Sequence, residues 1–246
     1  MGVSFDRAAD YYDRTRSHPD EAMAGAVRAL VELLGTGGGS LEIGAGTGRF
    51  SVPLQRAGLA IVPIDISRPM LQAGVGKGLR DPVRADAALL PFRDDAFASA
   101  LSAGVLGHLA DPRHALREIA RTVRGNYIGV AQRHIGFDPL ALYTELLHEA
   151  GQSRAPPEVT EESLSDHVPP RRVLAVSRSP VTFRADVVLD RLSRRFFSET
   201  WDVPEAIQQV VLERMRDRLQ AVDLRSTLVL EAHVWDVKSL GHALTP

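Results

Sequence analysis

Short apolar runs alternate with amphipathic helical patterns in the first half of the chain. The apolar runs are hydrophobic on both faces, which is typical of parallel strands that helices cover on both sides. A strand–helix alternation of this kind predicts an α/β fold with a doubly wound, mostly parallel sheet. Strands are predicted at residues 41–43, 60–66, 98–103 and 127–131, and helices at residues 49–57, 68–77 and 112–123.

The pattern changes on either side of this core. Residues 4–34 have the spacing of two helices separated at residues 17–19, and the glycine-rich run 35–39 ends the second helix. Residues 226–240 alternate well enough to predict a final antiparallel strand at or near the sheet edge. Between core and final strand, helices are predicted at residues 137–150, 161–167, 184–197 and 204–222, with a strand-like run at residues 172–176.

A helical block between two strands is the usual place of a substrate cap. We therefore interpret residues 1–246 as a single domain in four parts. These are N-terminal helices at 1–39, a ligand-binding core at 40–134, a helical cap and substrate region at 135–222, and a final strand at 223–246.

Composition narrows the function classes. The 246 residues are 44% hydrophobic and 24% charged, as in an average globular protein. A net charge of -2 lacks the basic excess of a nucleic-acid binder, and no apolar stretch reaches the roughly 18 to 20 residues of a membrane span. The absence of cysteine excludes disulfides, zinc–thiolate sites and cysteine nucleophiles. The excess of arginine over lysine is typical of a GC-rich bacterial genome. We expect a cytoplasmic protein with no metal, no nucleic-acid partner and no membrane insertion.

Three glycines follow directly on the strand at residues 41–43. Gly44 allows a sharp turn, Gly46 lets a ligand approach bare backbone, and Gly48 lets the next helix start close to the sheet. The loop lies at the carboxyl end of a strand, where open α/β sheets bind ligands. Its spacing, Gly-x-Gly-x-Gly, differs from the Gly-x-Gly-x-x-Gly of dinucleotide-binding proteins.

Acidic residues stand at the ends of three successive strands. Glu42 precedes the loop, where an acid would repel a pyrophosphate and suit a ligand that carries positive charge. Asp65 is placed to accept both hydroxyls of a ribose; the alternative is a helix N-cap, although Ser67 is the better placed cap. Asp86 is placed to accept from an adenine amine; the alternative is a turn residue. An adenine would also meet the Ala87 amide and an apolar wall of Ile66 and Met70.

These residues resemble a known family, the class I S-adenosylmethionine-dependent methyltransferases. The resemblance is carried by residues 42–48, Asp65 and residues 86–97, and it is strongest to the small-molecule branch with the ubiquinone/menaquinone-type C-methyltransferases. It extends over residues 5–124. The family implies a seven-stranded Rossmann-like sheet, S-adenosyl-L-methionine as cofactor, and a small-molecule methyl acceptor.

The resemblance implies further cofactor contacts. Residues 5–16 are similar to a segment that folds over the cofactor in relatives, so Tyr11 and Arg16 would contact its methionine part. Residues 102–109 match the family's fourth-strand segment, in which a backbone carbonyl near Ala103 holds the cofactor amine. Gly107 departs from the family, where a histidine or another bulky residue is common. The predicted cofactor-binding set is Tyr11, Arg16, Glu42, Gly44, Ala45, Gly46, Gly48, Asp65, Ile66, Met70, Asp86, Ala87, Ala103 and His108.

Methyl transfer from a sulfonium is an in-line displacement, and alignment of the reacting atoms supplies most of its rate. A base helps when the acceptor must lose a proton, and His108 is the best candidate; the alternative is a structural role at the helix after Asp111. His134 is a weaker candidate. Two other functions stay open, a nicotinamide-dependent oxidoreductase and a non-catalytic cofactor-binding regulatory module. We expect a monomer or a homodimer, and the acceptor is not identified by the sequence.

Overall fold

The structure, a computed structural model, describes residues 4–16, 20–153 and 155–243. The predicted break at residues 17–19 lies outside this part. The strands are β1 (Ser40–Ile43), β2 (Ile61–Asp65), β3 (Val83–Arg84), β4 (Phe97–Ala103), β5 (Val123–Gly136), β6 (Arg172–Thr182) and β7 (Arg225–Asp236). The longer helices are α2 (Asp20–Leu34), α3 (Ser51–Arg56), α4 (Arg68–Gly76), α5 (Pro112–Thr122), α6 (Pro139–Glu149), α8 (Ala185–Ser193), α9 (Glu205–Ala221) and α10 (Val237–Ala243).

The described strands form one sheet of seven, in the order β3-β2-β1-β4-β5-β7-β6. Neighbours from β3 to β5 are parallel, whereas β7 runs antiparallel to both β5 and β6. This arrangement confirms the predicted doubly wound, mostly parallel fold with one antiparallel late strand. The sheet order reverses beside β1, and such a reversal is where open α/β sheets bind ligands.

The last strand lies near the sheet edge, as predicted, but it is shorter than the predicted range 226–240. β7 ends at Asp236, where the aspartate oxygen accepts from the amide of Lys238 and helix α10 begins. β7 lies between β5 and β6, so that β6 is the edge strand on this side. The predicted strand at residues 172–176 therefore continues to Thr182, because it pairs with β7 along its length.

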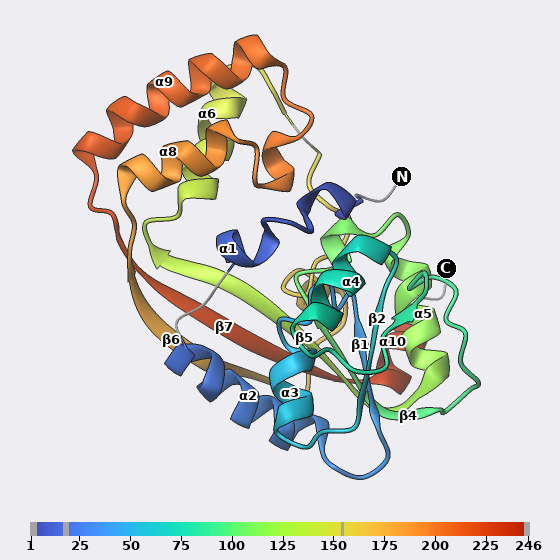
Figure 1. Cartoon of the computed structure of the whole chain (residues 1–246). Coiled ribbons are helices and arrows are strands. Elements are labelled where there is room, and N and C mark those ends of the chain that lie inside the picture. The colour runs from blue at the N-terminus through green and yellow to red at the C-terminus, as the bar shows by residue number, and fades with distance from the viewer. Residues whose placement is uncertain (1–3, 17–19, 154, 244–246) are drawn as a thin grey trace.

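Helices cover both faces of the sheet (Figure 1). α2 and α3 bury leucines and valines against one face, and α5 and α10 cover the other. Aspartates define two helix starts: Asp111 accepts from the amide of His114 to begin α5, and Asp138 accepts from Leu140 to begin α6. A proline follows each cap, as is favoured in a first helical turn.

A helical cap stands beyond the long strands β5, β7 and β6, at the upper left in Figure 1. α6, α8 and α9 bury their own apolar core, separate from those of the sheet. The range 135–222 interpreted as the cap also contains β6, so this part of the chain supplies a sheet strand as well as helices. Two predicted helices are shorter in the structure: α7 covers Leu164–His167, and α8 ends at Ser193 before Arg195 takes a left-handed φ of 56°.

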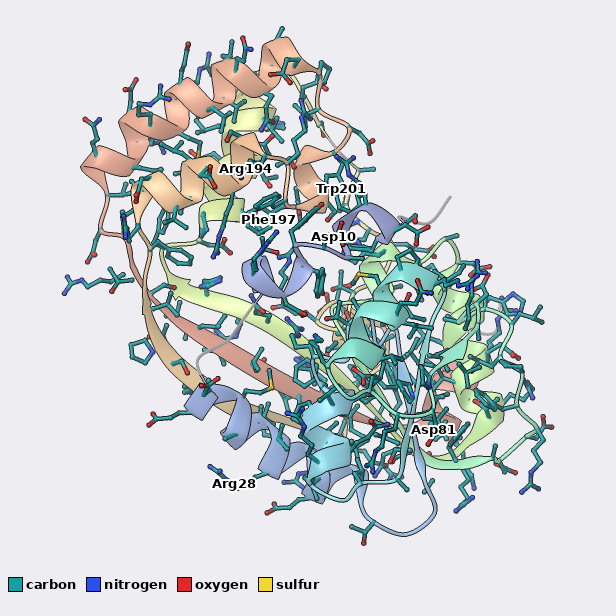
Figure 2. The ribbon with its side chains drawn as sticks, in the orientation of Figure 1. Asp10, Arg28, Asp81, Arg194, Phe197 and Trp201 are labelled. Carbon is teal, nitrogen blue, oxygen red and sulfur yellow. The ribbon has the colours of Figure 1, made fainter. Side chains whose placement is uncertain are left out.

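The N-terminal strap, residues 4–16, lies between the core and the cap. It contains two short helical turns, η1 (Asp6–Ala8) and α1 (Tyr12–Arg16). Asp13 attaches it to the core by accepting from the Thr47 hydroxyl and the Lys77 ammonium, both at 2.6 Å. On the other side, Figure 2 shows Phe197 and Trp201 on the face of the cap toward the strap, where Trp201 packs against Phe5. The strap thus bridges two parts that are far apart in sequence.

Candidate active site

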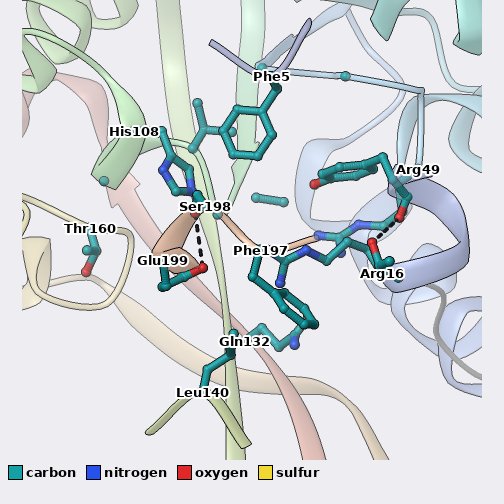
Figure 3. Close-up of a pocket in the computed structure, with 18 of the residues that line it drawn as sticks. Phe5, Arg16, Arg49, His108, Gln132, Leu140, Thr160, Phe197, Ser198 and Glu199 are labelled. Atoms are coloured by element: carbon teal, nitrogen blue, oxygen red, sulfur yellow. Dashed lines mark hydrogen bonds between the residues drawn. The ribbon is translucent and has the colours of Figure 1, made fainter. Parts of the chain in front are cut away.

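A cavity of about 1450 Å³ opens at the carboxyl ends of β1, β2 and β4. The core, the strap and the cap all contribute to its wall, and their side chains face one another in Figure 3. The predicted residues that line it are Arg16, Gly44, Gly46, Asp65, Ile66, Met70, Asp86, Ala87, Ala103 and His108. Tyr11, Glu42, Ala45 and Gly48 are not part of this wall.

The glycine loop is held against two neighbours. Gly46 (φ 57°) lines the cavity, and a Cβ at this position would lie 3.2 Å from the terminal carbon of Met70. A Cβ at Gly44 would lie 2.5 Å from a methyl of Val105, which brings the loop directly against the turn after β4. Ala45 is buried and its amide donates to the Ile64 carbonyl at 2.8 Å. Gly48 is also buried, where a Cβ would contact Val52 and Leu79.

Asp65 connects the loop to the next helix. One carboxylate oxygen accepts from the Gly46 amide and the other from the Ser67 amide, each at 2.8 Å. Burial raises the pKa of Asp65 above its ordinary value, against the lowering effect of these two amides. The cap of α4 is Ser67, whose hydroxyl accepts from the Met70 amide. Asp65 is therefore not the N-cap of α4, and its remaining lone pairs lie at the cavity wall.

The other two acids differ from Asp65. Glu42 is 2% exposed and lies beneath the loop, where its carboxylate accepts from the Ser51 hydroxyl; burial raises its pKa to about 7. Glu42 therefore does not line the cavity, and its expected place beside a positively charged ligand stays a prediction. Asp86 is exposed at the cavity wall, and one of its oxygens accepts from the Ala88 amide at 2.9 Å. Asp86 is therefore both a turn residue and a residue of the cavity wall.

The turn after β4, residues 103–108, carries Ala103 and His108 on the cavity wall. His108 lies in a short 3-10 turn, η2 (Leu106–His108), with its ring 4.9 Å from that of Phe5. It does not cap α5, since Asp111 does. His134, at the far end of β5, faces the same cavity and meets the Ser226 hydroxyl at 3.2 Å; burial lowers its pKa.

The strap places its two predicted residues differently. The guanidinium of Arg16 lines the cavity, 4.8 Å from the ring centre of Phe197. Tyr11 instead stacks on Phe196 of the cap, 4.5 Å between ring centres. Tyr11 therefore joins the strap to the cap and does not line the cavity.

Several wall residues were not found from the sequence. Phe5 and Asp6 come from the strap, and Asp6 accepts from the Ser67 hydroxyl at 2.5 Å. Gln132 lies on β5, and Glu161 comes from the segment before α7 with its carboxylate buried. Phe5 and Asp6 open the segment 5–16 that resembles the family, although only Tyr11 and Arg16 were singled out in it. Gln132 and Glu161 lie in no local motif.

The cavity has two chemically different ends. The polar end, around Gly46, Asp65 and Asp86, presents backbone amides and carboxylates. The apolar end lies between the long strands and the cap. Its apolar wall residues are Val130, Leu228 and Leu230 from the sheet and Leu140, Phe183, Val188, Leu192 and Phe197 from the cap side. The same elements also contribute polar and charged residues to the cavity wall: Gln132, His134, Asp138, Arg184, Arg191 and Glu199.

The sequence is similar to those of known methyltransferases. Residues 41–127 match the model of the methyltransferase domain family. The chain is 34% identical over 175 residues to a demethylmenaquinone methyltransferase of Renibacterium salmoninarum, covering 68% of this chain and 71% of that protein. The chain belongs to the class I S-adenosylmethionine-dependent methyltransferases. Within this family it is related to the menaquinone-type enzymes.

Other matches of this methyltransferase are more limited. It is 40% identical over 117 residues to a demethylmenaquinone methyltransferase of Paenarthrobacter aurescens, but this covers only 45% of either chain. A solved structure assigned to the type II methyltransferases, from Anaeromyxobacter dehalogenans, has a TM-score of 0.61 at 17% identity and covers 86% of this chain and 94% of its own. This last likeness concerns the fold alone. No helix in the described residues is both long and apolar enough to cross a membrane.

Proposed function

We propose that this protein transfers the methyl group of S-adenosylmethionine to a small acceptor bound at the apolar end of the cavity. The observation that carries the proposal is one continuous cavity that joins Asp65 and the bare Gly46 backbone to an aliphatic and aromatic compartment. A polar nucleoside and an apolar acceptor would meet there without crossing bulk water. Bound cofactor supplies an activated methyl on a positively charged sulfur.

The residues at the polar end fit an adenosyl group. Asp65 would accept from the ribose hydroxyls, and Asp86 with the buried Ala87 backbone would meet the adenine edge. Ile66 is 57% exposed although it is apolar, which suits a surface that an adenine ring covers. Met70 lies beneath Gly46 on the same wall.

The methionine end would lie toward the strap and the turn after β4. Arg16 supplies a guanidinium for a carboxylate, and the backbone carbonyl of Ala103 supplies an acceptor for an amine. Tyr11 would act indirectly, by holding the strap against Phe196. Glu42 would support the loop from beneath through Ser51.

The acceptor that we propose to test first is demethylmenaquinol. The relatives' name points to this ring system, and the apolar end suits a ring that carries a hydrocarbon chain. The reduced ring is the electron-rich form, so that its carbon can attack the methyl carbon while the carbon–sulfur bond breaks. The ring would then lose a proton, for which His108 on the turn after β4 is the candidate base.

Calorimetry and a transfer assay test the proposal in two steps. S-adenosylmethionine and its demethylated product, S-adenosylhomocysteine, should each bind with a one-to-one stoichiometry. Incubation with methyl-labelled cofactor and demethylmenaquinol should then label the quinol. Absence of binding by both nucleosides would refute the proposed function, and binding without transfer to any acceptor of a metabolite extract would favour a regulatory module. NADH titration followed by fluorescence separates the oxidoreductase alternative.

A further inference from the structure

A buried carboxylate joins the segment before α7 to the turn after β4. Glu161 is 2% exposed, and a single oxygen, Oε1, accepts three hydrogen bonds. The donors are the Ser102 hydroxyl at 2.7 Å, the Val105 amide at 2.8 Å and the Leu106 amide at 3.2 Å. Two consecutive amides and a hydroxyl that converge on one oxygen hold the turn's backbone in a single orientation.

The segment that carries Glu161 also packs tightly on this turn. We call residues 157–163 the brace. A Cβ at Gly107 would lie 3.3 Å from carbons of both Pro157 and Thr160, so glycine at this position lets the brace approach. A Cβ at Gly129 of β5 would lie 3.1 Å from Cγ of Glu161, which leaves the glutamate room to cross the strand. Glycine at position 107 therefore has a packing reason.

The hydrogen bonds of Glu161 continue into the core of the sheet. Ser102 Oγ also pairs with the Tyr127 hydroxyl at 2.6 Å, and the tyrosine ring stacks on Trp235 at 5.6 Å. Both rings are fully buried. Burial, together with the charge of Glu161, raises the pKa of Tyr127 well above its ordinary value, so that the phenol keeps its proton and can donate. A connected buried network of this kind is rigid when all its members are satisfied.

We propose that Glu161 is a positioning residue, which orients the turn after β4 so that the Ala103 carbonyl and His108 face the methionine end of the cofactor. The inference rests on the proposed function. In this role Glu161 acts as a hydrogen-bond acceptor at a fixed distance from the main chain, because the three donors need an oxygen at the end of a side chain as long as glutamate. A negative charge elsewhere in the same space would not replace it.

This distinction gives a test with four variants. Glu161→Gln keeps the length and an acceptor oxygen but removes the charge, whereas Glu161→Asp keeps the charge and shortens the reach by one methylene. Gly107→Ala pushes the brace from the turn without changing a polar group. Glu158→Gln is the matched control, because it removes an equal charge from the same brace at an exposed pair with Arg113.

The affinities for S-adenosylmethionine and S-adenosylhomocysteine are measured by calorimetry, with thermal unfolding of each variant as a check on folding. Positioning predicts that Glu161→Gln and Glu158→Gln stay within about threefold of the parent, while Glu161→Asp loses about tenfold or more, since an unpaired buried donor costs this much. The loss should be equal for the two nucleosides, because the turn holds the methionine part that they share. Gly107→Ala should weaken both in the same direction.

The opposite order overturns the inference. If Glu161→Asp binds like the parent while Glu161→Gln is weakened, and more for the cationic S-adenosylmethionine than for the uncharged thioether, Glu161 acts by its charge. Normal affinities in both Glu161→Asp and Gly107→Ala would show that the brace does not orient the site. Measurements on the parent protein distinguish the two proposals. If the parent binds neither nucleoside, the proposed function is refuted; if the parent binds and the variants do not follow the expected order, only the role of Glu161 is refuted.

Discussion

The two ends of the cavity are built in different ways. At the polar end, the contacts join neighbours in sequence or adjacent parallel strands. Asp65 at the end of β2 accepts hydrogen bonds from Gly46, in the loop after the neighbouring strand β1, and from Ser67, two residues later. At the apolar end, the wall is assembled from strands and helices that span residues 130–230 and from a cap with its own core. The polar end therefore depends on local backbone geometry, whereas the apolar end depends on how elements distant in sequence pack together.

This difference separates cofactor binding from acceptor binding. A left-handed glycine or an aspartate at a strand end serves one chemical purpose and tolerates little change. An aliphatic wall can change shape by substitution among residues of similar volume, at modest cost to stability. Variants at the two ends should therefore affect different measurements. The strap connects the two ends, because it contacts both the core and the cap.

The largest effect is expected for Gly46→Val. Its φ of 57° is unfavourable for a branched residue, and its Cβ would stand 3.2 Å from Met70 where the cofactor must approach. S-adenosylhomocysteine binding should fall by more than about a hundredfold while the protein stays folded. The matched control is Gly58→Val, which has a similar left-handed φ with open space around its Cβ. If Gly46→Val binds as well as this control, the loop is not the cofactor site.

Glu42→Gln tests whether the buried Glu42 contacts the cofactor at the polar end or only supports the glycine loop from beneath. Burial holds the folded pKa of Glu42 at about 7, above its ordinary value of 4.5, so the unfolded chain binds fewer protons between these values. The parent's stability should therefore fall as pH rises from about 4.5 to 7, by about 3 kcal/mol from this group. The variant lacks this loss.

Urea unfolding of parent and Glu42→Gln at a series of pH values measures that difference, in which other titrating groups cancel. The advantage of the variant should grow with pH through this window and then level off. A constant difference would mean that Glu42 ionises at its ordinary pH in the folded protein. S-adenosylhomocysteine affinity that is equal in both proteins would place Glu42 in the support rather than in the site.

Asp65→Ala should weaken S-adenosylhomocysteine binding by about 1 to 3 kcal/mol, the usual cost of leaving polar partners unpaired. The variant removes the expected ribose contact and also releases the amides of Gly46 and Ser67. Asp202→Ala, an exposed aspartate near the cap, is the control and should leave calorimetric affinity unchanged. An Asp65→Ala protein with full affinity would show that Asp65 only orders the loop.

The same contrast determines what could be predicted from the sequence. The strands, the glycine loop and the place of Asp65 follow from turn chemistry and apolar periodicity, which act over a few residues. Glu161 could not be found in this way, because its three donors lie 55 to 59 residues away and no motif marks it. For a related reason the sequence does not tell that the Glu42 side chain lies beneath the loop against Ser51, because all of β1 is buried and no alternation distinguishes its two faces. Likewise, Asp236 ends β7 through a helix start that the continuing apolar pattern conceals.

The smallest effect is expected at the apolar end, for Leu140→Ala. Leu140 is half-buried in the first turn of α6 and lines the cavity. An alanine at this position still donates the hydrogen bond from its backbone amide to Asp138. Loss of part of an apolar wall should raise the KM for demethylmenaquinol by about threefold to tenfold. S-adenosylhomocysteine affinity should not change. Val210→Ala, which trims an exposed valine of the cap, should alter neither quantity. A change in cofactor affinity with Leu140→Ala would break the proposed separation of the two ends, because a purely acceptor-facing wall has no contact through which to transmit it.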